Sequence, residues 1–209
     1  TFNGSGITIA KTAGAVTLAG NTTWVIKHNL TMTGGTLNLN GKNLTVNNVL
    51  IIGTGTTLRL HGNETISYVR MLSQRNSSIW YDSPTGGTVT MSNYPYQNVI
   101  IGSTGSTTFN LPTGQLNLSG SLTISGGTLA VNSNQNLNVS GSWLKTSATN
   151  AGFSAGGGTV RLTGRDQTMS GSTTFYNLTK NVTSPATLTF AATTTQTVSN
   201  TLTLQGTLG

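Results

Sequence analysis

Cysteine is absent from this chain of 209 residues, and charged residues are scarce. Without cysteine, neither a disulfide framework nor a thiolate metal site can form. Asp, Glu, Lys and Arg together make up 6% of the residues, whereas about a quarter is usual in globular proteins. No apolar run approaches the roughly 18 residues that a transmembrane helix requires, so we expect no membrane insertion.

Negative charge is especially sparse, because three acidic residues stand against ten Lys and Arg, which gives a net charge of +7. A basic balance favours nucleic-acid binding only where the cations gather on one face or helix. Here they are spread thinly from Lys11 to Lys180, so we expect no nucleic-acid partner. The two histidines, His28 and His61, have no acidic cluster beside them, and we expect neither a metal site nor a cofactor.

What the chain has instead is a regular pattern of apolar pairs separated by one residue. Leu30/Met32, Leu37/Leu39 and Leu44/Val46 are examples, and successive pairs begin about seven or eight residues apart. The two side chains of such a pair share one face of a strand. Mostly Gly, Asn, Thr and Lys fill the stretches between pairs and suit turns. The pattern predicts an all-β protein built from very short strands.

Strands this short form either a meander of hairpins or the sides of a coil. Asn40-Gly41 is the kind of two-residue loop that a hairpin favours. The same order of strands and turns recurs at long range, however, and such repetition is typical of a solenoid. We therefore predict a β-solenoid, similar to a right-handed β-helix, with three strands in each rung. On that geometry the chain forms about nine rungs, stacked about 4.8 Å apart.

The long-range repeat is visible in two segments of similar amino-acid sequence. Residues 29–46 read NLTMTGGTLNLNGKNLTV, and residues 121–139 read SLTISGGTLAVNSNQNLNV. We interpret residues 1–209 as a single solenoid array with repeat-like units at about 29–120 and 121–209. The repetition is expected because each coil must present the same inward ladder of Leu and Val to the coil above it.

The recurring GGTL, GGTV, FYNLT and TLTL segments resemble the Thr/Asn/Gly-rich β-solenoid repeats of large secreted bacterial surface proteins and of some bacteriophage virion proteins. The resemblance covers nearly the whole chain. It implies an extracellular rod, at a cell surface or a virion surface, without enzymatic residues. We expect a non-catalytic structural or adhesive protein of an extracellular filament, surface fibre or virion appendage. Surface glycans are a further expected partner.

Self-association is the main partner interaction that we predict. The end rungs of a solenoid expose backbone groups and an open apolar core, which isolated repeat proteins cover with caps. The sequence shows no amphipathic capping helix at either end. We expect flanking sequence or further copies, in a head-to-tail stack or another homo-oligomer, to complete the ends. Thr1 is not an initiator Met, so we also expect a chain that is processed, trimmed or part of something longer.

Residues 59–82 differ from the rest of the pattern, because Arg and aromatic residues are concentrated there. Such side chains are typical of binding hot spots for sugar rings or partner proteins. The simpler interpretation is an excursion whose Trp covers the core and whose charges pair in solvent. The predicted contact residues are Arg59, His61, Tyr68, Arg70, Arg75, Trp80 and Tyr81.

An enzymatic alternative has to be weighed, because polysaccharide lyases and tailspike hydrolases resemble this architecture. A glycosidase needs two carboxylates about 5–10 Å apart. Glu64 and Asp82 are close enough in sequence to serve as acid and base, whereas Asp166 lies far along the chain. Three scattered acids are too few for a calcium-dependent lyase. The alternative is thus a carbohydrate-binding or polysaccharide-degrading β-helix, while our prediction is a protein without enzymatic activity.

Overall fold

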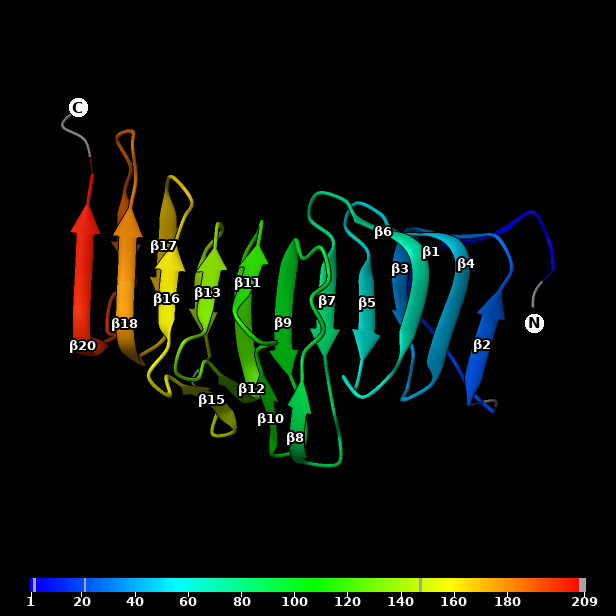
Figure 1. Ribbon diagram of the computed structural model, residues 1–209, viewed down its shortest axis with the longest axis horizontal. Helices are drawn as coiled ribbons and strands as arrows, with labels where there is room; N and C mark the ends of the chain where they lie inside the picture. Colours follow the sequence, from blue (N-terminus) through cyan, green and yellow to red (C-terminus); the bar gives the residue numbers. More distant parts are fainter. Residues whose placement is uncertain (2, 21, 147, 207–209) are drawn as a thin grey trace.

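Parallel β-strands wind into one long coil in the computed structural model of this chain (Figure 1). The structure describes residues 1, 3–20, 22–146 and 148–206. Within these residues there is no helix, and every ladder between strands is parallel. The two termini lie at opposite ends of the rod (Figure 1). The prediction of an all-β solenoid with about nine turns is confirmed.

The described residues form twenty strands, and several of these bend at a corner so that one strand serves two sides. In chain order the strands are β1 (Gly6–Thr17), β2 (Thr23–Ile26), β3 (Asn29–Asn38), β4 (Asn43–Ile52), β5 (Thr57–Leu60), β6 (Ile66–Ser73), β7 (Ser78–Tyr81), β8 (Gly87–Thr90), β9 (Asn98–Gly102), β10 (Thr107–Asn110), β11 (Gln115–Leu118), β12 (Leu122–Ala130), β13 (Asn136–Val139), β14 (Trp143–Lys145), β15 (Ala151–Ser154), β16 (Thr159–Leu162), β17 (Gln167–Ser170), β18 (Thr173–Asn181), β19 (Leu188–Phe190) and β20 (Gln196–Gln205).

The strands line up in three columns, and the chain visits them in the same order in every coil. Side 1 contains residues 6–9, 29–32, 50–52, 71–73, the segment around Tyr96, 115–118, 136–139, 159–162, 177–180 and 201–205. Side 2 contains residues 15–17, 36–38, 57–60, 78–81, 98–101, 122–124, 143–145, 167–170 and 188–190. Side 3 contains residues 23–26, 43–46, 66–68, 87–90, 107–110, 127–130, 151–154, 173–175 and 196–198.

The core lies inside the coil and is filled by the apolar pairs of the sequence pattern. In β5, Leu58 and Leu60 are buried, whereas Thr57 and Arg59 face outwards, because successive side chains of a strand point to opposite faces. Leu58 is 0% exposed, and removing a side chain of this size from water contributes about 1.5–3 kcal/mol. The same alternation recurs along most strands, so the stability of the fold rests on this stacked interior.

Corners between sides are made by short turns. At Asn40 and Gly41 the backbone has φ angles of 50° and 73°, a left-handed conformation that Gly and Asn tolerate best. This turn joins residues 36–38 on side 2 to residues 43–46 on side 3, and each segment pairs with neighbouring coils rather than with the other segment. The Asn-Gly pair therefore serves a corner of the coil and not a hairpin.

Side 2 is the spine of the rod. Its ladder runs without interruption from residues 15–17 to residues 188–190. On side 3, by contrast, no ladder among the described residues joins β6 to β8 or β15 to β18. On side 1 a single bridge, between Tyr96 and Leu118, stands where the ladder after β6 should continue. The three sides of the coil are thus unequal.

Aromatic side chains fill the core at both interruptions of side 3. Between β6 and β8 lies a cluster of Tyr68, Tyr81, Tyr94, Tyr96 and Phe109, with neighbouring ring centres 5.5–6.5 Å apart. Between β15 and β18 lies a cluster of Trp143, Phe153 and Phe175, with ring centres 4.9–5.5 Å apart. The rings pack against one another where the side 3 ladders are missing, whereas the strands that carry Tyr81, Phe109 and Trp143 remain paired with both neighbouring coils.

The long-range repeat does not return to the same side of the coil. Residues 30 and 32 lie on side 1, whereas their counterparts in the second copy, residues 122 and 124, lie on side 2. Likewise Leu44 lies on side 3 and its counterpart Leu137 on side 1. The second copy is thus turned by one side. The repeating unit is the single side with its corner, because any side can supply the inward pair that the next coil needs.

Candidate contact surfaces

Arg59 and Trp80 lie next to each other on the outer face of side 2. They are paired residues in the β5–β7 ladder, and the guanidinium carbon lies 4.6 Å from the centre of the Trp80 ring, a cation–π contact. Arg59 also forms an ion pair with Asp82, whose side chain is 6% exposed. Gly102 in the next coil makes room for the indole, since a Cβ there would lie 2.4 Å from Nε1. These side chains form a compact outer cluster.

Two of the predicted contact residues face inwards. Tyr81 is 1% exposed, and its hydroxyl forms a hydrogen bond with that of Tyr96. Burial raises the pKa of Tyr81 and of Tyr96 well above the usual tyrosine range. Tyr68 is half-buried and packs beside Tyr94, with ring centres 6.4 Å apart. A buried side chain cannot touch a partner, so the prediction of a contact role for Tyr81 is wrong.

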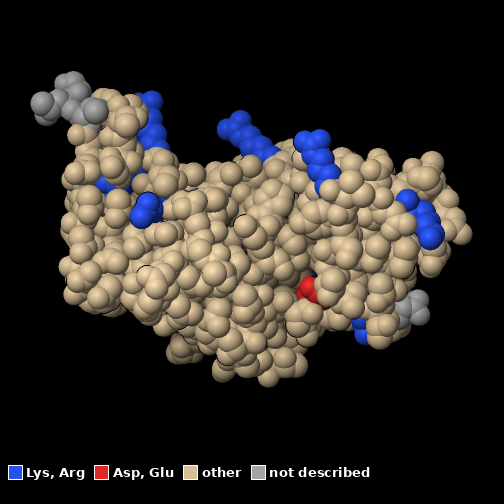
Figure 2. All heavy atoms as spheres, in the orientation of Figure 1, with Lys and Arg blue, Asp and Glu red and all other residues tan. Residues whose placement is uncertain are grey.

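The remaining three predicted residues lie outside the strands of side 2. Arg70 is exposed in β6, Arg75 is exposed in the turn that follows β6, and His61 is half-buried at the corner after β5. The structure therefore does not gather the seven residues into one patch. On the face that Figure 2 shows, Lys and Arg side chains are spread along the rod, with several of them close together near its C-terminal end.

Glu64 closes a corner of the coil. Its Oε1 accepts hydrogen bonds from the backbone N–H of Gly41 at 3.1 Å and of His61 at 2.7 Å, and its Oε2 accepts one from Gly62 at 2.7 Å. The side chain is buried, and the three donors satisfy a carboxylate that would otherwise be costly to bury. Both acids of the enzymatic alternative, Glu64 and Asp82, are thus engaged in structural contacts that include residues of the preceding coil, Gly41 and Arg59 respectively. In the described part of the chain no three His, Asp or Glu residues gather as a metal site would require.

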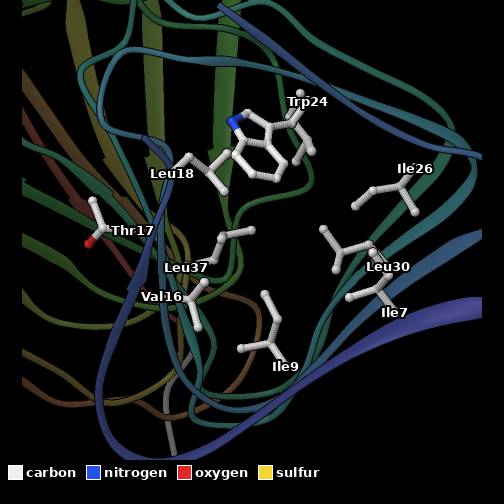
Figure 3. A pocket seen from close by; sticks show the side chains of 10 residues that line it. Ile7, Ile9, Val16, Thr17, Leu18, Trp24, Ile26, Leu30 and Leu37 are labelled. Carbon is white, nitrogen blue, oxygen red and sulfur yellow. The ribbon is translucent and has the colours of Figure 1, made fainter. Parts of the chain in front are cut away.

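An apolar cavity of about 300 Å³ opens at the N-terminal end of the rod (Figure 3). It is lined by Ile7, Ile9, Val16, Thr17, Leu18, Trp24, Ile26, Leu30, Leu37 and Leu44. These side chains come from the first turns of the coil, and the apolar ones labelled in Figure 3 surround one interior space, whereas Thr17 is exposed and points away from it. The cavity is the open interior of the solenoid.

The interior of the solenoid is also open at the C-terminal end, where apolar side chains protrude from it. Leu202 and Leu204 lie in register with the buried residues Leu178 and Lys180, and so point inwards. They are nevertheless 53% and 56% exposed, and Phe190 in β19 is 49% exposed, because these residues have a coil on one side of them only. Among the described residues, both ends of the rod therefore combine an open apolar core with strand edges that have no neighbouring strand.

A smaller cleft of about 250 Å³ opens on side 1, where that ladder is interrupted. It is lined by Ser73, Asn93, Tyr94, Pro95, Tyr96, Gln97, Asn117 and Ser119. The lining offers amides and hydroxyls without any charge, and the Ser73 hydroxyl is buried with no hydrogen-bond partner among the described residues. Uncharged donors and acceptors of this kind suit a neutral, hydroxyl-rich ligand.

Lys180 is a feature that the sequence analysis missed. Its side chain points inwards from side 1 and is buried, and Nζ donates to the backbone carbonyls of Gly164 and Arg165 and to Oε1 of Gln167. Desolvation lowers the pKa of Lys180, an effect that the charge of Asp166 opposes. The position carries Leu162 in the coil before it, so the pattern alone predicts an apolar residue. The ammonium group thus places a hydrogen-bonded charge in the otherwise apolar interior near the C-terminal end.

Comparisons with protein-family models, with curated proteins and with solved structures found no match. No helix that could cross a membrane is present among the residues that the structure describes. The fold defines the class of protein, a parallel β-solenoid, and the proposals below rest on its geometry.

Proposed function

We propose that this chain is a non-catalytic structural or adhesive β-solenoid of an extracellular filament, surface fibre or virion appendage, and that it assembles with copies of itself through its ends. The observation that carries the proposal is the complementarity of those ends. One end has an apolar cavity, and the other presents Phe190, Leu202 and Leu204 about half-exposed. Contact between unlike surfaces of identical subunits produces an open filament, and free strand edges favour it by strand addition.

The first experiment is light scattering and negative-stain electron microscopy of the purified chain over a range of concentrations. We expect rods longer than one subunit that grow with concentration. Leu202→Glu places a charge in the contact and should raise the concentration needed for assembly at least tenfold, because a buried unpaired charge costs several kcal/mol. Val69→Glu is the matched control, since Val69 is 75% exposed in β6, away from both ends. Wild-type chains that stay monomeric at every concentration would overturn the proposal.

A glycan-binding role is the second candidate, and the neutral cleft beside Tyr96 favours it. Neutral oligosaccharides titrated into the protein should shift the side-chain amide signals of Gln97 and Asn117, and Asn93→Ala should weaken binding. Asn110, on side 3, is the control position. For a polysaccharide-degrading form, the wild type must release sugar ends and Glu64→Gln must abolish the release. A wild type that releases none across a polysaccharide panel would contradict that form.

A further inference from the structure

The ends of the coil are steps rather than flat faces. The chain climbs by one coil for every three sides, so the first strand of a coil lies lower than the last. At the N-terminal end the lowest segment is residues 6–9, on side 1. At the C-terminal end the highest segment is residues 201–205, also on side 1, and the lowest free edge is β19 on side 2. In the part of the chain that the structure describes, side 1 thus holds one segment more than side 2 or side 3.

A second copy can add to the C-terminal end in three orientations that keep its sides aligned with those of the first. Without rotation, side 1 meets side 1, but sides 2 and 3 are each left short of one strand, a gap of about 4.8 Å beyond normal spacing. A rotation by two sides leaves one such gap, on side 2. A rotation by one side leaves none. In that orientation β1 covers β19 and then the first part of β20, and β2 covers the rest of β20.

We propose that copies of this chain stack head to tail with each copy turned by one-third of a turn relative to the copy below it. This inference rests on the proposed function and specifies its interface. The path of the coil then runs from one subunit into the next without a step, and side 2 of one copy continues as side 1 of the next. The turn matches the long-range repeat within the chain, in which the second copy is also displaced by one side.

The side chains that meet in this orientation are complementary. Inward residues of the lower copy face inward residues of the upper copy, in the pairs Leu188–Ile7, Phe190–Ile9, Val198–Val16, Leu202–Trp24 and Leu204–Ile26. The protruding side chains enter the cavity of about 300 Å³ shown in Figure 3. Residues 6–9, residues 15–17, β2, β19 and β20 contain no charged residue, although edge strands that avoid pairing are usually protected by charges.

Disulfide cross-linking distinguishes the three orientations. Because the chain has no native cysteine, only the introduced cysteines can form a disulfide. Thr8 lies between Ile7 and Ile9 and faces outwards. In the proposed stack its neighbour across the interface is Thr189, without rotation it is Thr203, and with rotation by two sides it is Thr197. Neighbouring strands bring Cα atoms about 5 Å apart, within the range for a disulfide. The variants are Thr8→Cys/Thr189→Cys, Thr8→Cys/Thr203→Cys and Thr8→Cys/Thr197→Cys.

After mild oxidation, we expect Thr8→Cys/Thr189→Cys to give a ladder of covalent oligomers on a non-reducing gel, at least tenfold more than the other two pairs. Adding Leu202→Glu should abolish the ladder. Preferential linking of either other pair would overturn the orientation while leaving end-to-end assembly intact. Assembly by light scattering without linking in any pair would overturn end-to-end stacking itself. A monomeric wild type would instead refute the proposed function, so the failures are distinguishable.

Discussion

Residues 29–60 and residues 61–101 build adjacent parts of one coil in different ways. In the first region the inward side chains are Leu, Met, Val and Ile, and strands pair with the next coil on all three sides. In the second region four tyrosines occupy the interior. Among the described residues, β6 has no ladder to the following coil on side 3 or side 1, whereas β7 on side 2 and β8 on side 3 keep theirs.

Large rings in the core accompany the loss of ladders on side 1 and side 3, but not on side 2. Tyr81 and Tyr96 lie with their rings tilted by 44° and their centres 6.5 Å apart, an arrangement that aromatic pairs favour. Tyr81 nevertheless keeps its ladder partners Leu60 and Ile101 in the neighbouring coils. Trp143, Phe153 and Phe175 pack together where β15 and β18 lack a ladder, although β14 pairs with both of its neighbours on side 2. Ring packing thus stands where backbone pairing is missing from one side of the coil.

Removing the largest ring from the second aromatic cluster should have the largest effect on stability. Trp143 is 1% exposed, and its Nε1 donates to Thr173 Oγ1 at 3.2 Å. Trp143→Ala is expected to lower the free energy of unfolding by about 3–5 kcal/mol, as measured by chemical denaturation. Leu144→Ala is the control, because Leu144 is 40% exposed on the outer face, and it should cost under about 1 kcal/mol. Equal losses would mean that the cluster does not support the coil.

Hydrogen exchange should distinguish strands that pair on both edges from strands that pair on one edge only. Amides of β7 pair with both neighbouring coils, whereas those of residues 66–68 in β6 pair on one edge only. Local opening is easier where backbone hydrogen bonds and packing are fewer. We expect the β7 amides to exchange on the order of 100-fold more slowly than the amides of residues 66–68. Similar protection in both strands would show that the missing ladder has no energetic consequence.

The sequence predicts most of this architecture and little of its irregularity. Period-two apolar pairs with short polar corners predict the strands, the parallel coil and the inward faces of residues such as Leu37 and Leu58, because alternation fixes the face. The same pattern gives Tyr81 no distinction from Trp80, and only the register shows which of the two points inwards. Lys180 cannot be assigned to the interior from sequence, since its three acceptors come from segments that the fold brings together.

The buried tyrosines should make the stability of the fold depend on pH in the alkaline range. Burial raises the pKa of Tyr81 and Tyr96, so the folded state favours their neutral forms. The resulting stability is present below the unfolded pKa of about 10 and is lost as the pH rises above it. Each tyrosine that ionises only in the unfolded chain should lower stability by about 1.4 kcal/mol per pH unit there. Denaturation at several alkaline pH values measures the slope, which the double variant Tyr81→Phe/Tyr96→Phe should flatten.

Trp80→Ala should have the smallest effect on the free energy of unfolding, and it tests the outer face of side 2. Trp80 lies outside the core and contacts Arg59, a cation–π pair worth about 0.5–1 kcal/mol at exposed sites. The β-sheet circular dichroism should persist, and the free energy of unfolding should fall by no more than about 1 kcal/mol. Because the proposed stacking uses the ends, assembly measured by light scattering should be unchanged, as for the Val69→Glu control. Loss of assembly with an intact fold would instead place the subunit contact on side 2, around Arg59 and Trp80.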